Sequence, residues 1–245
     1  MVPEDKINEF VQKMRTASGA NLQSVILYGS AASGDYHAEF SNVNLFCVLH
    51  DTSYATLRRL APAVKWWERQ KQPPPLFMTR QELERSTDVF TIELIDMVQH
   101  HRVLWGEDVV RSLQVSMRLH RVQVEYELRE KLLLLRQHLM LAGDDDRRVR
   151  EVLLRSVASF ATLFRHALVA LSETPPISRR DAVLQLSSRL GFDPSAMEKI
   201  LDMRERKADS KRLHALEIVS GYVHAVETVI AAVDTIDGPN APTGS

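Results

Sequence analysis

The sequence has 245 residues, of which 44% are hydrophobic and 26% are charged, a composition that suits a globular protein of one or two domains. Its formal net charge of -1 excludes a global basic field for nucleic acid, although a local patch stays open. Cys47 is the single cysteine, which excludes an intrachain disulfide and a thiolate metal cluster. The first six residues include three charged side chains and lack an apolar signal core, and no run reaches the roughly 18–20 apolar residues of a membrane span. We therefore expect a cytoplasmic protein without a membrane segment.

The first 110 residues show alternating helix and strand signals. The expected elements are a helix ended by Gly19, a strand at Val25–Tyr28, a helical turn at Ala31–Gly34, a strand at Val43–Leu49, a helix at Tyr54–Arg69, a strand at Leu76–Met78, a short helix opened by the capping box Thr79–Glu82, and a strand at Phe90–Met97. Helical spacing predicts the buried face of the first helix: Ile7, Phe10, Val11 and Met14. The second long helix is expected to bury Leu57, Leu60, Ala61 and Val64.

From about Ser112 onward, every strong periodic signal is helical. The expected helices run from about Ser112 to Leu141, from Asp144–Asp146 to a point before Pro175, from Ser178 to Gly191, from Asp193–Pro194 onward, and from about Ser210 to Val233. The sequence thus predicts an α+β protein with a small mixed-sheet domain at residues 1–110, a helical bundle at 111–237, and a disordered tail at 238–245.

A strand that ends in Gly29-Ser30 and leads into a helical turn is the first feature with chemical meaning. Such a turn points backbone N–H groups and the Ser30 hydroxyl at whatever lies above it, which suits a phosphate. A Gly-Ser pair after a strand is nevertheless often only a turn. The loop alone therefore does not decide between a binding site and a simple connection.

The start of the second strand adds a specific pattern, Ser41-Asn42-Val43-Asn44-Leu45. Alternate residues of a strand point to the same face, so Asn42 and Asn44 are expected side by side. If the two strands are neighbours, both amides lie near the mouth of the Gly-Ser loop. The pattern therefore predicts one polar site built from the loop and the second strand.

At this point the sequence resembles the nucleotidyltransferase superfamily of DNA polymerase beta, and within it the kanamycin nucleotidyltransferase-like and minimal nucleotidyltransferase branches. The matching positions are Gly29, Ser30, Ala32, Gly34, Ser41 and Leu45. The stretch from Arg80 to Gly106 is similar to the later part of the domain in bacterial members, where Glu93 falls near the third family carboxylate. The resemblance implies a nucleotidyltransferase-fold domain followed by a helical bundle.

The departure from this family is as specific as the match. The resemblance implies paired aspartates that hold two magnesium ions, but this sequence has Asn42 and Asn44 there. Magnesium prefers anionic oxygen ligands, and charge stabilisation dominates phosphoryl transfer. We therefore expect metal affinity and turnover to be lower by orders of magnitude. We expect no catalytic residues, no metal site and no cofactor, with Glu93 as a possible remnant ligand.

Three other carboxylates, Asp35, Glu39 and Asp51, lie close enough in sequence to be considered as replacement ligands. Carboxylates in loops and at strand ends are usually only solvated, so we do not assign them this role. His37, in the motif loop, is expected to be exposed.

Several other conspicuous residues favour structural roles. His100 and His101 are expected to point to opposite faces of a strand, so they would not chelate one metal. Trp66 and Trp67 are expected to divide between the core and a domain contact. The arginine clusters at 147–148, 179–180 and 204–207 are interpreted as solvated faces without interleaved aromatics, so a nucleic-acid partner is not expected. The arginine–histidine spacing of HEPN ribonucleases is absent from the helical half.

The leading hypothesis is a cytoplasmic pseudoenzyme that binds a nucleotide weakly through Gly29 and Ser30, or acts as a regulatory or interaction module. The first alternative is an active magnesium-dependent nucleotidyltransferase that moves a nucleoside monophosphate onto a hydroxyl of a small molecule or protein. The second is a scaffold without ligand. A homodimer or a protein partner is expected to use the helical half.

Overall fold

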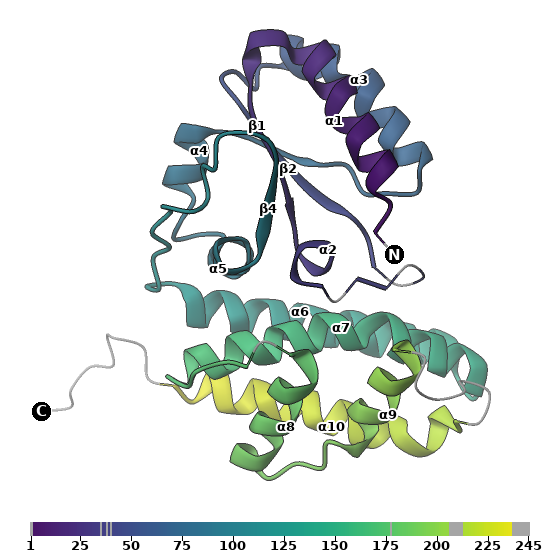
Figure 1. The fold of residues 1–245 in the computed structure, drawn as a ribbon. Helices are drawn as coiled ribbons and strands as arrows, with labels where there is room; N and C mark the ends of the chain where they lie inside the picture. The colour runs from purple at the N-terminus through teal and green to yellow at the C-terminus, as the bar shows by residue number, and fades with distance from the viewer. Residues whose placement is uncertain are drawn as a thin grey trace, which may run out of the picture. The chain divides into compact units, whose positions relative to one another are not determined.

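A computed structural model of the chain describes residues 2–34, 36–37, 39, 41–176, 178–205 and 213–236. The chain divides into two compact units, Met1–Arg118 and Leu119–Ser245, and each is described here by itself. The predicted α+β class is confirmed: a mixed sheet occupies the first unit, and the second is helical (Figure 1). The predicted disordered tail and the expected start of the last helix lie outside the described residues.

The first unit is built on a four-stranded sheet. Its strands are β1 (Leu22–Tyr28), β2 (Asn44–Leu49), β3 (Leu76–Thr79) and β4 (His101–Gly106). They lie in the order β3-β2-β1-β4, with β1 antiparallel to both neighbours and β2 parallel to β3. The first two predicted strands are therefore neighbours, and Tyr28 at the end of β1 pairs with Asn44 at the start of β2.

Helices cover both faces of this sheet (Figure 1). On one face, α1 (Glu4–Ser18) and α3 (Tyr54–Arg69) share a hydrophobic core with Val25, Leu27 and Leu45. On the other face, α4 (Arg80–Arg85) and α5 (Thr91–Gln99) pack against Ile26, Phe46 and Val48. The predicted buried face of α1 is correct at all four residues, Ile7, Phe10, Val11 and Met14. The predicted capping box is also present, because Thr79 and Glu82 exchange side chain–backbone hydrogen bonds at the start of α4.

The predicted strand at Phe90–Met97 is wrong, because this stretch forms helix α5. Its β-branched and aromatic residues suit a strand, but Leu94 and Met97, three residues apart, are both buried against the sheet. Glu93 lies in the first turn of the helix, where a carboxylate interacts favourably with the helix dipole. The strand of this region is β4, which begins at His101 and pairs with β1.

The predicted buried face of α3 is only partly correct. Leu60 is buried, but Leu57 is 38% exposed, and the inward side carries Thr56, Ala63 and Trp67 instead. The helix is turned so that Trp67, which is fully buried, packs against Phe10 with a centroid distance of 5.0 Å. The predicted and the observed buried faces of α3 both have helical spacing. The observed face is favoured because it buries the large apolar surface of Trp67.

The second unit consists of helices that pack around α7 and α10. Its helices are α6 (His120–Ala142), α7 (Asp146–Ala170), α8 (Arg179–Leu190), α9 (Ser195–Arg204) and α10 (Ala215–Asp234). Helix α7 contacts each of the other four, which explains the ten buried residues along its length. Helix α6 begins eight residues later than the expected Ser112, and the unit boundary follows Arg118 rather than residue 110, because Val109 and Val110 are buried against the sheet.

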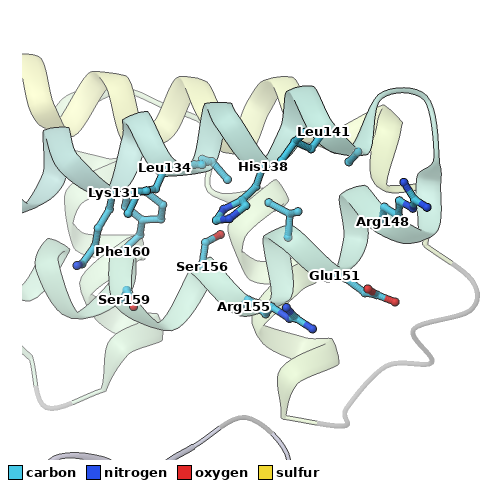
Figure 2. A pocket seen from close by; sticks show the side chains of 13 residues that line it. Lys131, Leu134, His138, Leu141, Arg148, Glu151, Arg155, Ser156, Ser159 and Phe160 are labelled. Atoms are coloured by element: carbon cyan, nitrogen blue, oxygen red, sulfur yellow. The ribbon is translucent and has the colours of Figure 1, made fainter.

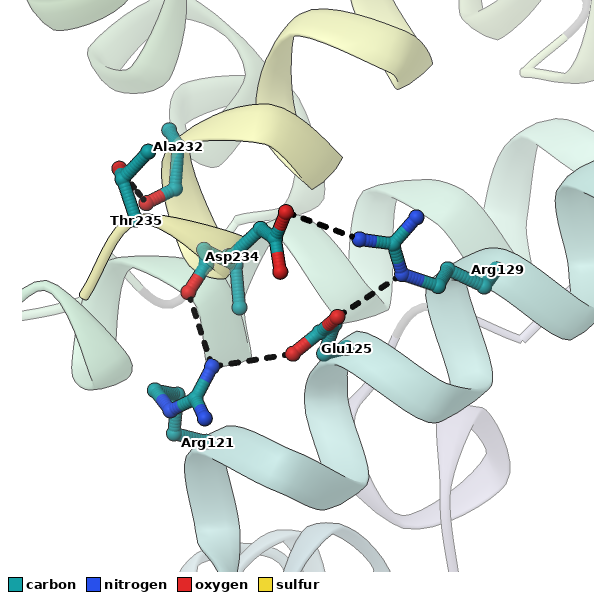
Figure 3. A network of polar contacts seen from close by, with 7 residues as sticks. Arg121, Glu125, Arg129, Ala232, Asp234 and Thr235 are labelled. Carbon is teal, nitrogen blue, oxygen red and sulfur yellow. Dashed lines mark hydrogen bonds and ion pairs between the residues drawn. The ribbon is translucent and has the colours of Figure 1, made fainter. Parts of the chain in front are cut away.

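An ion-pair network joins α6 to the end of α10 (Figure 3). Glu125 accepts hydrogen bonds from Arg121 at 3.0 Å and from Arg129 at 2.8 Å, and Arg129 also pairs with Asp234 at 3.1 Å. By length and composition alone, α7 and α10 are apolar enough to cross a membrane, with 50% and 33% of their most apolar windows buried in the structure. Central helices of a bundle have the same properties.

Candidate nucleotide site at the end of β1

The Gly-Ser loop leaves the sheet through a glycine conformation. Gly29 has φ 71° and ψ -153°, a region that is essentially restricted to glycine. Its carbonyl oxygen accepts hydrogen bonds from the backbone N–H groups of Ala32 and Ser33, at 2.9 and 3.0 Å, and this closes the single turn α2 (Ser30–Ser33). The chain then turns again at Gly34, which has φ 90°. The local sequence thus positions Ser30 directly after the strand.

Asn44 lies against this loop, as the spacing predicts. A Cβ atom added to Gly29 would be only 2.9 Å from Nδ2 of Asn44, so the amide as placed lies directly against the glycine. Strand β2 begins at Asn44, so the exposed Asn42 precedes the strand rather than belonging to it. Within the described part of the chain, the side chains of Ser30, Asn42 and Asn44 make no hydrogen bonds, which leaves them available to a ligand.

Ser41, another residue that matches the family pattern, makes hydrogen bonds with the backbone of His37. The backbone N–H of His37 donates to the Ser41 hydroxyl at 3.0 Å, and the Ser41 N–H donates to the His37 carbonyl at 2.7 Å. These two bonds close the segment between α2 and β2. His37 was expected to be exposed, but it is half-buried, and its ring Nδ1 is enclosed by protein.

Glu93 reaches the same end of the sheet from α5. Burial, and to a smaller extent the charge of Glu93, raise the pKa of Tyr28 to about 12. Tyr28 and Asn44 are paired residues of antiparallel strands, so their side chains share one face of the sheet. The remnant carboxylate is therefore on a helix rather than a strand, but its charge acts on the residue that precedes Gly29. Sequence reasoning missed Tyr28, although its place immediately before the Gly-Ser pair was the signal.

Comparison with known proteins identifies the first unit. Residues 5–100 match the nucleotidyltransferase domain family. This stretch, most of the first unit, therefore carries a nucleotidyltransferase domain. A spectinomycin adenyltransferase from Enterococcus faecialis, crystallised with ATP and spectinomycin, shares the fold at 12% identity, with a TM-score of 0.59 over 95% of this chain and 99% of that chain.

A toxin–antitoxin structure with AMP-PNP aligns over 41% of this chain and 74% of that chain, at 16% identity and with a TM-score of 0.29. That TM-score carries no structural argument. No curated protein sequence matches the chain.

The nucleotidyltransferase fold implies magnesium, but the residues on the sheet do not fit that ion. None of the four strands, all of which the structure describes, carries an aspartate or glutamate. Magnesium sites use carboxylate oxygens, whereas Asn44 offers a neutral amide. Among the described residues, no group of three or more His, Cys, Asp or Glu side chains is placed to hold a metal.

Asp51, which was considered as a replacement metal ligand, has a structural role instead. It follows the far end of β2, roughly 20 Å from Asn44 at the usual rise per strand residue. Its carboxylate accepts hydrogen bonds from the hydroxyl groups of Thr56 and Ser53 and from the Ser53 N–H, and these bonds lower its pKa. Asp35 lies outside the described residues. Glu39 is described and exposed.

The other conspicuous residues of the nucleotidyltransferase domain have structural partners. His101 contacts the Met97 carbonyl oxygen at 2.7 Å through Nδ1 and Asp108 at 2.9 Å through Nε2, so it is a satisfied histidine as predicted. Trp67 belongs to the core, whereas the half-buried Trp66 lies beneath Lys13, whose Nζ is 5.0 Å from the ring centroid.

The interpretation of the arginine clusters as solvated faces is wrong for Arg180. Its side chain is only 20% exposed and contacts Asp202 at 2.7 Å, Glu205 at 3.3 Å and Glu198 at 3.6 Å. It therefore ties α8 to α9 and the residue that follows it. Arg147 and Arg148 are exposed, as expected, with side-chain exposures of 71% and 62%. Arg206 and Lys207 lie outside the described residues.

Proposed function

We propose that the end of the sheet beside Gly29 binds a nucleotide weakly, without a divalent metal, and that this protein no longer carries out nucleotidyl transfer. The observation that carries the proposal is the combination of a retained loop with an uncharged second strand. Gly29 keeps a backbone conformation restricted to glycine at the end of β1, and the Asn44 amide lies beside it. The strands supply no carboxylate to a metal.

The chemistry of the side chains supports binding rather than turnover. Ser30 offers a hydroxyl group, and Asn42 and Asn44 offer amide N–H donors, all of which suit phosphate oxygens. The amide N–H groups of Asn42 and Asn44 can donate hydrogen bonds to phosphate oxygens, which an aspartate at either position would repel. The two asparagines therefore favour a nucleotide that carries no bound metal ion. ATP bound to the adenyltransferase that shares this fold supports the choice of a nucleoside triphosphate as the first ligand to test.

The proposal is tested by calorimetric titration of ATP into the full-length protein, once with EDTA and once with magnesium. We expect weak binding that magnesium does not strengthen. The double substitution Asn42→Asp/Asn44→Asp should reverse this behaviour, because two carboxylates repel the bare triphosphate and hold the metal complex. The matched control is Asn8→Asp/Gln81→Glu, which adds the same two charges at exposed positions on α1 and α4 and should behave like the wild type.

Two rival functions give different results in the same experiment. Magnesium-dependent transfer of a nucleoside monophosphate by the unmutated protein, abolished by Glu93→Gln, would establish an active enzyme in which Glu93 helps to hold the ion. No binding of ATP under either condition would establish a scaffold. A homodimer formed through the helical unit and a cytoplasmic location stay predictions, and neither is needed for this test.

A further inference from the structure

The helical unit contains a groove that the nucleotide site does not use. It lies between α6 and α7, has a volume of about 460 Å³, and is lined entirely by residues of these two helices (Figure 2). This volume is in the range of about 300–1,000 Å³ that is usual for small-molecule sites. The groove is therefore a candidate for a ligand with few atoms rather than for a macromolecule.

The walls of the groove are apolar. Leu134, Leu135 and Leu141 come from α6, and Val152 and Phe160 from α7. Leu134 is 45% exposed and Leu141 is 77% exposed, whereas Leu135 and Phe160 are buried in the core, so the two exposed leucines offer the apolar surface that a ligand can cover. Burying exposed leucine surface against an apolar ligand is favourable by about 25 cal/mol per Å². The groove should therefore bind a ligand with an apolar body more tightly than one without it.

Its charged residues are mostly cationic and have a regular spacing. On α6, Lys131 and His138 are seven residues apart, and on α7, Arg148 and Arg155 are seven residues apart. Seven residues make about two helical turns, so each pair shares one helix face. Figure 2 shows Lys131 toward one end of the groove, Arg148 toward the other, and the His138 ring between the helices near Ser156.

Only some of these cations have partners. Lys131 pairs with Glu127 at 2.9 Å, and Arg148 pairs with Asp145 at 3.4 Å. In contrast, the side chains of His138 and Arg155 make no hydrogen bond or ion pair with any residue that the structure describes. Glu151 is the single carboxylate in the lining, and it contacts Arg147, which lies outside the lining, at 3.9 Å. Because Lys131 and Arg148 each have an acidic partner, Arg155 is the cation of the lining that has no anionic partner among the described residues, and His138 adds a polar side chain that makes no hydrogen bond there.

The polar floor is held in place by the bundle. The Ser156 hydroxyl is 2.9 Å from the Tyr222 hydroxyl on α10, and Tyr222 is fully buried. Burial raises the pKa of the Tyr222 phenol, so this group stays a neutral hydrogen-bonding partner at physiological pH. This contact keeps the α7 side of the groove in position without using His138 or Arg155.

We infer that this groove binds a small amphipathic anion, with its apolar body along Leu134 and Leu141 and its single anionic head group at Arg155 and His138. The apolar wall excludes a bare inorganic anion as the preferred ligand, since such an ion gains nothing from it. The guanidinium of Arg155, which has no anionic partner among the described residues, disfavours a cationic ligand of the same shape. An anionic head accepts charge-assisted hydrogen bonds from the guanidinium of Arg155.

The test uses the full-length protein with decanoate as the probe, measured by displacement of the fluorescent anion 8-anilinonaphthalene-1-sulfonate. Decanoate should displace the dye, whereas decanol, decyltrimethylammonium and inorganic phosphate should be much weaker. Monodecyl phosphate in a parallel titration distinguishes a phosphate head group from a carboxylate. Decanol that competes as well as decanoate would overturn the proposal, because the groove would then select only for apolar bulk.

Two matched pairs of variants locate the binding. Arg155→Gln should weaken decanoate by about tenfold, the equivalent of one charge-assisted hydrogen bond, while Arg58→Gln at an exposed position of α3 should have no effect. Leu134→Asp should weaken it further through charge repulsion and loss of the wall, while its neighbour Leu133→Asp should not. Equal effects within either pair would contradict the assignment of this groove. All four positions are exposed, so the variants should fold.

Discussion

The two ends of strand β2 carry opposite chemistry. At the start of the strand, Asn44 lies beside the Gly-Ser loop with a neutral amide that makes no hydrogen bond within the described structure. Beyond its end, Asp51 has a charged carboxylate that accepts three hydrogen bonds and fixes the beginning of α3. The end beside the Gly-Ser loop has no carboxylate on the strand itself, whereas the carboxylate at the other end is committed to the start of α3.

This difference shows how the unit uses its carboxylates. Glu82 closes a capping box at α4, and Asp108 binds His101 and the backbone N–H of Arg111. Although burial acts to raise the pKa of Asp108, these hydrogen bonds lower it. Each of these acids is committed to local structure, as Asp51 is, and moving one to a metal would leave a helix end or a histidine without its partner. The loop end therefore depends on hydrogen-bond donors.

The largest expected effect comes from the close approach at the loop end. Gly29→Ala forces an unfavourable backbone conformation, which costs about 1–3 kcal/mol of unfolding free energy, and pushes a Cβ atom into the Asn44 amide. Gly19→Ala is the matched control, because Gly19 has a similar conformation, φ 55° and ψ -132°, with open space around it. Urea unfolding should show a larger loss for Gly29→Ala. Adding Asn44→Ala should restore the additional loss of unfolding free energy in the Gly29→Ala protein but not in the Gly19→Ala protein. Equal losses of unfolding free energy for Gly29→Ala and Gly19→Ala would refute the contact between residue 29 and Asn44.

A smaller effect is expected at the other end of β2. The hydroxyl of the buried Thr56 donates to Asp51 and accepts from Arg59 at 3.1 Å. Thr56→Val keeps the shape and removes both bonds, so the unfolding free energy should fall by about 1 kcal/mol. The same substitution should leave ATP binding unchanged. A parallel loss of ATP binding would show that the two ends are coupled.

The pH dependence of stability separates the charge of Asp51 from its shape. Because the folded-state pKa is lowered from 3.8, its contribution is fully present above about pH 4 and is lost as the pH falls through the folded value. The stability difference between the wild type and Asp51→Asn should therefore be constant near neutral pH and shrink in acid. Chemical unfolding at a series of pH values measures it, and a difference that does not depend on pH would show that the charge of Asp51 does not stabilise the start of α3.

The smallest effect concerns the remnant carboxylate. Burial is the main reason that the pKa of Tyr28 is about 12, and the charge of Glu93 adds to it. Glu93→Gln should lower this pKa by part of the shift, while Glu84→Gln on the exposed face of α4 should not change it. Ultraviolet titration of tyrosinate, with Tyr28→Phe to identify the signal, measures the change. An unchanged Tyr28 pKa would place Glu93 away from the site.

Sequence reasoning succeeded where short-range rules determine structure and failed where tertiary packing decides. Gly29, the capping box at Thr79 and the start of β2 follow from local chemistry, and all were predicted within a residue or two. The α5 region has residues that suit either a strand or a helix, and only its packing against Ile26 and Phe46 selects the helix. The α3 face was decided by Trp67, whose partner Phe10 is distant in sequence.

The groove of the helical unit shows the same limit in a different way. Its cations lie at regular spacing on each helix, but the pairing of the Lys131 face with the Arg155 face requires the antiparallel packing of α6 and α7. Sequence patterns describe one helix at a time. A site shared by two helices becomes visible only when their contact is known.

The central claim is that the site beside Gly29 no longer binds a divalent metal, and the binding of Mn²⁺ tests it most directly. Mn²⁺ substitutes for magnesium, and electron paramagnetic resonance measures the concentration of the free ion. The wild-type protein with AMP-PNP should leave the free-ion signal at the level set by the nucleotide alone. Asn42→Asp/Asn44→Asp should reduce it, which shows that the geometry is intact and only the charge is missing. The contrary result is a wild-type protein that lowers the free Mn²⁺ signal and a Glu93→Gln variant that does not. It would show that the wild-type site holds a metal ion.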